Sequence, residues 1–218
     1  HAAPNEMQGA LASKPENITY AEAAVVPTAG FEALHFLRKA NVARGQKILI
    51  FGAGGSIGTF SVQLAKHFGT EVTGVDSAGK LDMLKSIDAD YVIDYAKEDF
   101  TKNEVTYDVI IDVVGKKSFS RRLKSLKPNG HYFLANAGLS HIIIGKLTSL
   151  TSNKKVVLVS AKQKKEDLLF LKELIETGQL KPIIDRCYPL EQVAEAHKYV
   201  ETGSKKGNVC ITVGHHKT

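Results

Sequence analysis

Short apolar runs alternate along this chain with segments of helical spacing. The run from Ile48 to Phe51 ends at a glycine, which is typical of a buried parallel strand. Residues 56–68 then place apolar side chains three and four positions apart, and Gly69 ends the predicted helix. The same alternation predicts further strands at 71–77, 90–95, 107–115, 130–138 and 154–161, and further helices at 80–87 and 118–126.

Strands that alternate with helices indicate an α/β fold with a parallel sheet and right-handed crossovers. Outside that core, the pattern predicts helices at 20–24, 30–40, 167–177 and 190–199, and strands at 181–189 and 207–213. No internal repeat and no linker rich in proline, glycine or serine divides the 218 residues.

Composition excludes several classes of protein. Hydrophobic residues make up 43% and charged residues 24%, which is usual for a globular chain and unlike a disordered one. No apolar run approaches the roughly 20 residues of a membrane span, and the first ten residues do not resemble a signal peptide. The two cysteines, Cys187 and Cys210, have no metal-ligand spacing, so we expect a reducing, cytoplasmic setting.

The net charge is +6, and lysines occur in scattered pairs such as Lys154–Lys155 and Lys205–Lys206, mostly beside predicted loops. We interpret these pairs as solvated surface; a polyanion-binding face is the alternative.

The most informative segment is the glycine-rich turn GAGGSIG at residues 52–58, between a predicted strand and a predicted helix. Its frame Ala53-x-Gly55-x-x-Gly58 matches a dinucleotide-binding fingerprint with alanine in the first place. Gly55 lets the backbone approach a pyrophosphate, Gly58 lets the helix pack on the strand, and the helix N-terminus attracts phosphate. We therefore expect a Rossmann-type, doubly wound parallel sheet of about six strands that binds a dinucleotide, with a purely structural glycine turn as the alternative.

The predicted second strand ends at Asp76, 21 residues after Gly55. A carboxylate at this place accepts hydrogen bonds from ribose hydroxyls and repels a 2′-phosphate, which favours NAD. Lys80 either neutralises a 2′-phosphate, pairs with Asp76 or faces solvent.

Other enzyme classes lack their motifs. No tyrosine has a lysine four residues on, as a short-chain reductase needs, and neither Gly-x-Ser-x-Gly nor a Walker pattern is present. The histidines lack metal-ligand spacing, so we expect no metal site, and no residue is predicted to be catalytic.

From about Ala10 to Val213, the chain resembles the cofactor-binding half of the medium-chain dehydrogenase/reductase superfamily. The resemblance is to its zinc-independent quinone-oxidoreductase-like branch, also labelled NAD(P)-dependent alcohol dehydrogenase. It is carried by the runs ALASKPENITYAEAAVVPTAGFEALHFLRKA, GQKILIFGAGGSIGTFSVQLAKHFG, EVTGVDS, DADYVIDYAKEDF, YDVIIDVVGKKSFSRRLKSLKPNGHYFL and YPLEQVAEAHKYVETGSKKGNVCITV.

This resemblance implies roles for individual residues in binding NAD(P)(H). The pyrophosphate is expected at Ala53, Gly54, Gly55, Ser56, Ile57 and Gly58. The adenosine ribose and its 2′-phosphate are expected at Asp76, Ser77, Lys80 and Tyr95, and the nicotinamide half at Gly115, Asn136, Ala137 and Gly138. Thr28 is expected to approach the cofactor from the preceding helix. Lys80 with Tyr95 is the pairing of NADPH-using relatives, whereas Asp76 departs from it. The choice of cofactor therefore stays open, with a lean to NAD(H).

Two absences complete the comparison with this superfamily. Pro27 stands about where zinc-dependent members have a metal-ligand cysteine, so we expect no zinc catalysis. The N-terminal chaperonin-10-like catalytic domain is missing from this sequence. The resemblance therefore divides the chain into residues 1–27, the end of that domain and a connector; 28–180, the dinucleotide-binding domain; and 181–218, a strand-helix-strand that returns toward the missing domain.

The predicted function is therefore NAD(P)(H) binding within an oxidoreductase that transfers hydride to or from a quinone, enone, aldehyde or alcohol. As an isolated chain it is expected to be inactive. The alternative is a non-catalytic nucleotide-binding module, a redox sensor or a nucleic-acid-binding protein, that keeps this fold. Relatives also suggest a homodimer through an edge strand at Lys155 to Ser160, with an ordinary guarded sheet edge as the alternative.

Overall fold

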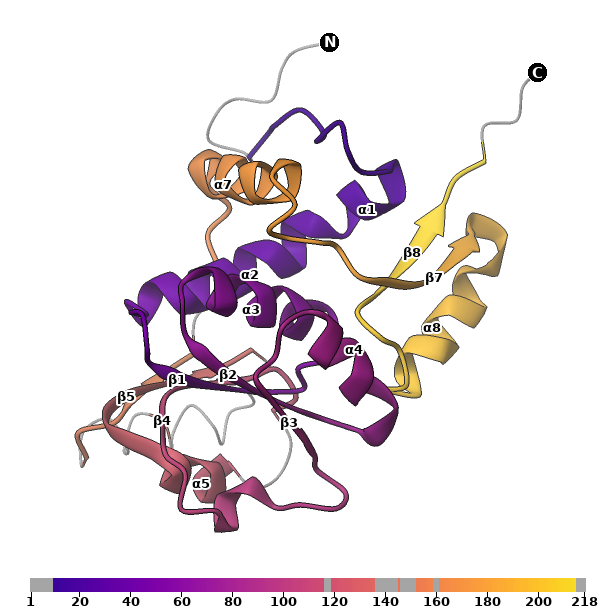
Figure 1. The fold of residues 1–218 in the computed structure, drawn as a ribbon. Helices are drawn as coiled ribbons and strands as arrows, with labels where there is room; N and C mark the ends of the chain where they lie inside the picture. The colour runs from indigo at the N-terminus through magenta and orange to yellow at the C-terminus, as the bar shows by residue number, and fades with distance from the viewer. Residues whose placement is uncertain (1–9, 116–118, 136–144, 146–151, 159–160, 215–218) are drawn as a thin grey trace.

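The computed structural model of the chain describes residues 10–115, 119–135, 145, 152–158 and 161–214 (Figure 1). Its main sheet has six parallel strands in the order β3-β2-β1-β4-β5-β6. This order is that of a doubly wound dinucleotide-binding fold, which confirms the predicted fold class. The strands are β1 (Lys47–Phe51), β2 (Glu71–Asp76), β3 (Tyr91–Asp94), β4 (Tyr107–Asp112), β5 (Leu126–Leu134) and β6 (Lys155–Val157).

Helices cover both faces of the sheet. In Figure 1, α2 and α3 lie directly against one face with α7 and α1 stacked beyond them, while α5 lies on the other face. The described helices are α1 (Tyr20–Ala24), α2 (Val26–Lys39), α3 (Ser56–His67), α4 (Leu81–Ser86), α5 (Phe119–Arg122), α7 (Lys165–Glu176) and α8 (Val193–Glu201). Short 3₁₀ turns lie at Ala78–Lys80, Phe100–Lys102, Leu123–Ser125 and Leu190–Gln192.

Each strand contributes side chains to two hydrophobic cores, because successive side chains of a strand point to opposite faces of the sheet. Ile48 and Ile50 of β1 are fully buried in the core under α2, α3 and α7. Leu49, between them, is fully buried in the second core, on the side of α5. This burial on both faces explains the continuous apolar runs in the sequence.

Several predicted boundaries are wrong. Helix α2 begins at Val26 and not at residue 30, because Pro27 occupies its first turn, where proline fits a helix. The helix predicted over 118–126 ends as α-helix at Arg122, and β5 begins at Leu126 and not at residue 130. A break in register between β4 and β5 accommodates these extra residues, with Asn129 in the left-handed conformation at φ 62°.

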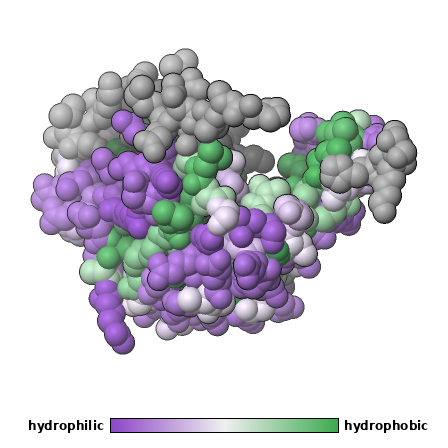
Figure 2. Space-filling view, turned by 90° about the horizontal axis from the view of Figure 1, so that it is seen from above, coloured by the Kyte–Doolittle hydropathy of each residue, from purple (hydrophilic) through white to green (hydrophobic). Residues whose placement is uncertain are grey.

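The C-terminal segment forms a separate small lobe. Strands β7 (Ile184–Pro189) and β8 (Asn208–Thr212) pair in parallel as their own two-stranded sheet, and α8 connects them. Figures 1 and 2 show this lobe set off at one side of the molecule, with apolar surface among its polar side chains. The backbone N–H of Gly207, just before β8, donates to the carbonyl oxygen of Gly54 at 2.8 Å, which joins the lobe to the glycine-rich turn. Among the described residues, no helix is both long and apolar enough to cross a membrane.

Candidate functional site

The glycine-rich turn leads from β1 into α3 at the carboxyl end of the sheet. Gly52 has a φ of 83°, a conformation that a side chain would strain. A Cβ atom at Gly58 would lie 2.4 Å from the carbonyl oxygens of both Gly52 and Ala53. Only glycine therefore allows α3 to approach the strand this closely, as the fingerprint predicts.

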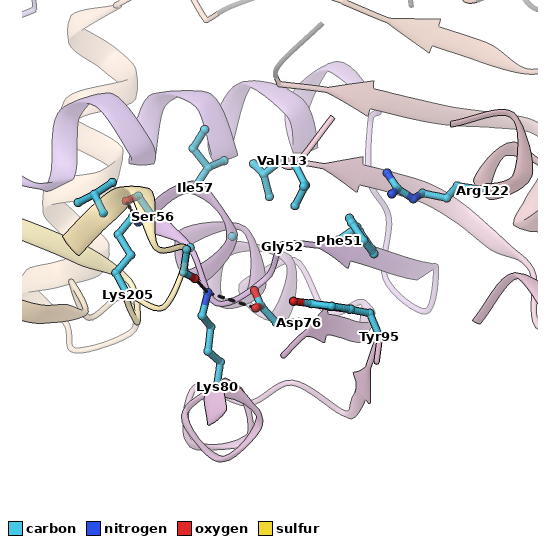
Figure 3. Close-up of a pocket in the computed structure, with 15 residues that line it drawn as sticks. Phe51, Gly52, Ser56, Ile57, Asp76, Lys80, Tyr95, Val113, Arg122 and Lys205 are labelled. Atoms are coloured by element: carbon cyan, nitrogen blue, oxygen red, sulfur yellow. Dashed lines mark hydrogen bonds and ion pairs between the residues drawn. The ribbon is translucent and has the colours of Figure 1, made fainter. Parts of the chain in front are cut away.

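The first turn of α3 borders an open cavity of about 680 Å³ (Figure 3). Gly55 is the N-cap and provides no side-chain cap, and Ser56, Ile57 and Gly58 line the cavity. The first N–H groups of a helix have no partner within the helix, and they carry the positive end of its dipole. This part of the cavity therefore favours an anion.

Asp76 and Lys80 form a buried ion pair at the end of β2. The Nζ atom of Lys80 lies 3.2 Å from Oδ1 of Asp76, and the two residues are 7% and 6% exposed. Oδ2 of Asp76 accepts the backbone N–H of Gly54 at 2.8 Å, and Oδ1 accepts that of Ser77 at 2.8 Å. Lys80 also donates to the carbonyl oxygen of Gly203 at 2.9 Å. The pairing of Lys80 with Asp76 is therefore present in the structure, and the binding of a 2′-phosphate by Lys80 stays a prediction.

A second lysine, Lys205, reaches the same turn from the C-terminal lobe. Its Nζ atom donates to Oγ of Ser56 at 2.9 Å and to the carbonyl oxygen of Gly207 at 2.6 Å. Burial, and next the charge of Lys80, lower the pKa of Lys205 below the usual lysine range. The interpretation of Lys205 as solvated surface is therefore wrong, whereas its neighbour Lys206 is exposed.

The opposite wall of the cavity is apolar and aromatic. Phe51 lies beside Tyr95, with ring centroids 6.4 Å apart, and the guanidinium of Arg122 stacks on Phe51 at 3.9 Å from its ring centroid. Val113 and Val114, after β4, complete this wall. A flat, partly apolar ring fits between such groups.

Asp112 holds this wall in place from within the sheet. Its Oδ1 atom accepts the backbone N–H groups of Val114 at 3.1 Å and Gly115 at 3.0 Å. Its Oδ2 atom accepts a hydrogen bond from Arg122 and one from the hydroxyl of Tyr132 at 2.6 Å. Burial and the charge of Asp112 raise the pKa of Tyr132, so the phenol stays protonated and donates.

The structure brings seven of the fifteen predicted residues together in the lining of this cavity. Its lining includes Gly55, Ser56, Ile57, Gly58, Asp76, Lys80 and Tyr95. Ala53 and Gly54 are buried in the turn, Ser77 contacts Asp76, and Gly115 follows the valines of the wall. Thr28 is exposed on α2 and does not line the cavity. Asn136, Ala137 and Gly138 lie outside the described residues.

Sequence reasoning missed eight lining residues. They are Phe51, Gly52, Val113, Val114, Arg122, Val200, Gly203 and Lys205. Phe51 and Val113 lie at the carboxyl ends of predicted strands. In open α/β sheets ligands bind at these strand ends, so this rule would have identified both residues from the sequence. The residues of the C-terminal lobe carried no such signal.

Comparisons with known proteins agree on one family. The family model described as "Zinc-binding dehydrogenase" matches residues 87–211. The chain is 36% identical to 2-methylene-furan-3-one reductase of Solanum lycopersicum over 205 residues, and 32% identical to the chloroplastic NADPH-dependent alkenal/one oxidoreductase of Arabidopsis thaliana over 205 residues. Each match covers 92% of this chain but 49% of the relative, so the chain spans about half the length of these relatives.

A solved structure supports the same assignment. The quinone oxidoreductase from Coxiella burnetii superposes with a TM-score of 0.84 at 29% identity, covering 93% of this chain and 64% of that one.

Proposed function

Because this chain belongs to the zinc-binding dehydrogenase family of the medium-chain dehydrogenase/reductase superfamily, we propose that it is the NAD(P)(H)-binding half of a hydride-transferring oxidoreductase. One observation carries the proposal. The N-terminus of α3 and the ammonium group of Lys205 meet at one end of a cavity whose other wall is aromatic and apolar. This arrangement matches a pyrophosphate joined to a flat base.

The residues of the turn fit this cofactor. The N–H groups at the start of α3 and the charge of Lys205 would bind the pyrophosphate, and Gly58 keeps the helix close to it. Phe51, Tyr95 and the valines after β4 would enclose the adenine. Once bound, the nicotinamide supplies or accepts the hydride, and the protein provides binding and orientation.

The choice between NAD(H) and NADP(H) rests on Asp76 and Lys80. Both residues line the cavity, and in their ion pair the positive charge of Lys80 balances the negative charge of the Asp76 carboxylate. A 2′-phosphate would compete with Asp76 for Lys80, whereas ribose hydroxyls would donate to Asp76 and leave the pair intact. We propose use of both cofactors, with NAD(H) preferred by the chain itself; the Arabidopsis relative is by its name NADPH-dependent.

The family description names zinc, but the described part of the chain does not fit such a metal. Among its residues, no three histidine, cysteine, aspartate or glutamate side chains gather as metal ligands. Pro27 lies in the first turn of α2, in the segment where zinc-dependent relatives carry a ligand cysteine. We therefore propose zinc-independent hydride transfer and assign no step to a metal.

We further propose that a catalytic domain completes the enzyme and that residues 1–27, 28–180 and 181–218 are its connector, the cofactor domain and the returning lobe. Exposed Leu190, Val193 and Val213 support docking of this lobe on that domain. The names of the two relatives favour a conjugated enone as substrate. Without the catalytic domain, we expect the chain to bind the cofactor but not to turn over a substrate.

The test compares two adjacent lysines. We expect NADH and NADPH to bind the chain saturably in calorimetric titration, and Lys205→Ala to weaken both about tenfold, or about 1.4 kcal/mol. Lys206→Ala is the matched control, because this neighbouring side chain is exposed, and the variant should bind like the parent chain.

Two results would contradict the proposal. If neither NADH nor NADPH bound saturably at millimolar concentration, the proposal that this chain binds the cofactor would be wrong. Steady-state enone reduction by the isolated chain would show that no further domain is needed.

A further inference from the structure

The two cysteines of the chain lie opposite each other on neighbouring strands of the C-terminal lobe. Strands β7 and β8 run in parallel, and their register pairs Cys187 with Cys210. Both are free thiols: Cys187 is exposed and Cys210 is buried. Paired residues of adjacent strands project from the same face of a sheet, so the two sulfur atoms share one face. They are also near enough to hydrogen-bond, a contact that adds to burial in raising the pKa of Cys210.

The geometry suits a covalent bond between them. Adjacent strands are about 4.8 Å apart, and disulfides join residues whose Cα atoms are roughly 4.4–6.8 Å apart. The backbone pairing therefore already holds the cysteines within bonding range, and only the side chains need to rotate.

We propose that Cys187 and Cys210 form a redox-sensitive dithiol, which a peroxide closes to an intrachain disulfide. The exposed Cys187 meets the oxidant first, and the buried Cys210 resolves the product. Nothing in this proposal depends on cofactor binding.

The chemistry proceeds in two balanced steps. The sulfur of Cys187 attacks one peroxide oxygen, so that an S–O bond forms, the O–O bond breaks, and the leaving hydroxide takes the thiol proton as water. The sulfur of Cys210 then attacks the sulfenic sulfur of Cys187, forming the S–S bond and expelling the oxygen as water with the proton of Cys210. Two thiols are oxidised and one hydrogen peroxide is reduced to two waters.

This disulfide would close the segment that borders the cavity. Between the two cysteines lie α8 and the loop whose Gly203 and Lys205 contact Lys80 and Ser56. A crosslink across β7 and β8 ties both ends of this segment together and restricts its local opening. The oxidation state of the thiols is therefore coupled to the mobility of one wall of the cavity.

The experiment treats the 218-residue chain with a small excess of hydrogen peroxide. We expect both thiols to disappear in a thiol assay and the intact mass to fall by two hydrogen atoms. Tryptic digestion without reductant should give peptide 187–198 joined to peptide 207–217, and dithiothreitol should separate them. Amide hydrogen exchange over 193–205 should slow in the oxidised chain.

Single variants distinguish the two roles. In Cys210→Ser, peroxide should convert Cys187 to a sulfenic acid that dimedone traps. In Cys187→Ser, the buried Cys210 should stay reduced. Circular dichroism checks that both variants are folded. The proposal would be overturned by oxidation that consumes one thiol per chain, by crosslinks between chains in place of the intrachain bond, or by unchanged exchange over 193–205 in the oxidised chain.

Discussion

At the scale of single residues, Asp76 has a different setting from the one that its place in the sequence suggests. The sequence predicts a carboxylate whose oxygens are available to accept hydrogen bonds from ribose hydroxyls. In the structure, its oxygens already accept the N–H groups of Gly54 and Ser77 and pair with Lys80. Its charge therefore also organises the turn, and any substitution changes both the recognition of ribose and the position of Lys80.

We predict that Asp76→Ser shifts the ratio of NADPH to NADH affinity about tenfold toward NADPH, or about 1.4 kcal/mol. The substitution removes a negative charge from the 2′-phosphate position and frees Lys80 from its ion pair. Lys80→Ala should weaken NADPH and leave NADH nearly unchanged. Calorimetric titration of both cofactors measures the ratio, with Asp82→Ser on the exposed face of α4 as the control. A ratio that does not move would show that Asp76 does not face the ribose.

We expect Lys205 to make cofactor affinity depend on pH. Its pKa is lowered by burial and by the charge of Lys80, so the positive charge is lost as the pH rises through a range below the ordinary lysine value of about 10.4. We predict that the dissociation constant of NADH rises as the pH is raised toward about 10.4, because the pyrophosphate loses this partner before an ordinary lysine would lose its charge. In Lys205→Arg the guanidinium stays protonated, so the profile should flatten. Identical profiles for the parent chain and Lys205→Arg would exclude Lys205 as the titrating group.

At the scale of secondary-structure elements, the buried group Asp112–Arg122–Tyr132 connects the end of β4 to α5 and β5. Arg122 is 6% exposed and Asp112 is fully buried, whereas the neighbouring Arg121 pairs with Asp99 at the surface. We predict that Arg122→Ala lowers the free energy of unfolding by about 3–5 kcal/mol, because it leaves a buried carboxylate without its partner. Arg121→Ala should cost less than about 1 kcal/mol. Urea denaturation measures both, and equal costs would contradict the assigned role of Arg122.

The elements were largely predictable because their periodicity is local. The run Ile48–Phe51 and the glycines after it identify the first strand, the turn and α3 from a dozen adjacent residues. The start of β5 was not predictable from the sequence. A break in register between β4 and β5 determines where β5 begins, and no local sequence pattern indicates that break.

The site divides in the same way. Gly55, Gly58 and Asp76 are fixed by positions within one strand-turn-helix-strand unit, so the fingerprint finds them. Lys205 comes from about 150 residues away in sequence through the packing of the C-terminal lobe, and Arg122 looks like a surface residue of a short helix until its buried partner Asp112 is seen. Only tertiary structure brings such side chains together.

At the scale of the whole molecule, the small lobe links the cofactor cavity to the remainder of the proposed enzyme. It contacts the glycine-rich turn through Gly207 and Lys205 and exposes apolar side chains such as Leu190 and Val213 elsewhere. One segment therefore has both a cofactor-side and an outward surface. Docking of a catalytic domain on the outward surface would fix Lys205 in the cavity, which relates domain closure to the retention of cofactor.

The main sheet ends at β6 with an edge that we propose as a dimer interface. Among the described strands, β6 pairs only with β5 and ends the six-stranded sheet, whereas Val159 and Ser160 of the predicted edge lie outside the described residues. A two-fold axis beside β6 would join two such sheets through backbone hydrogen bonds. We predict a mass of twice the single chain in size-exclusion chromatography with light scattering at tens of micromolar. Val156→Lys, which adds a charge of the kind that guards natural edges, should shift the population to monomer while circular dichroism shows an intact fold. A parent chain that is strictly monomeric at that concentration would refute this interface, because a continuous sheet needs no ligand to form.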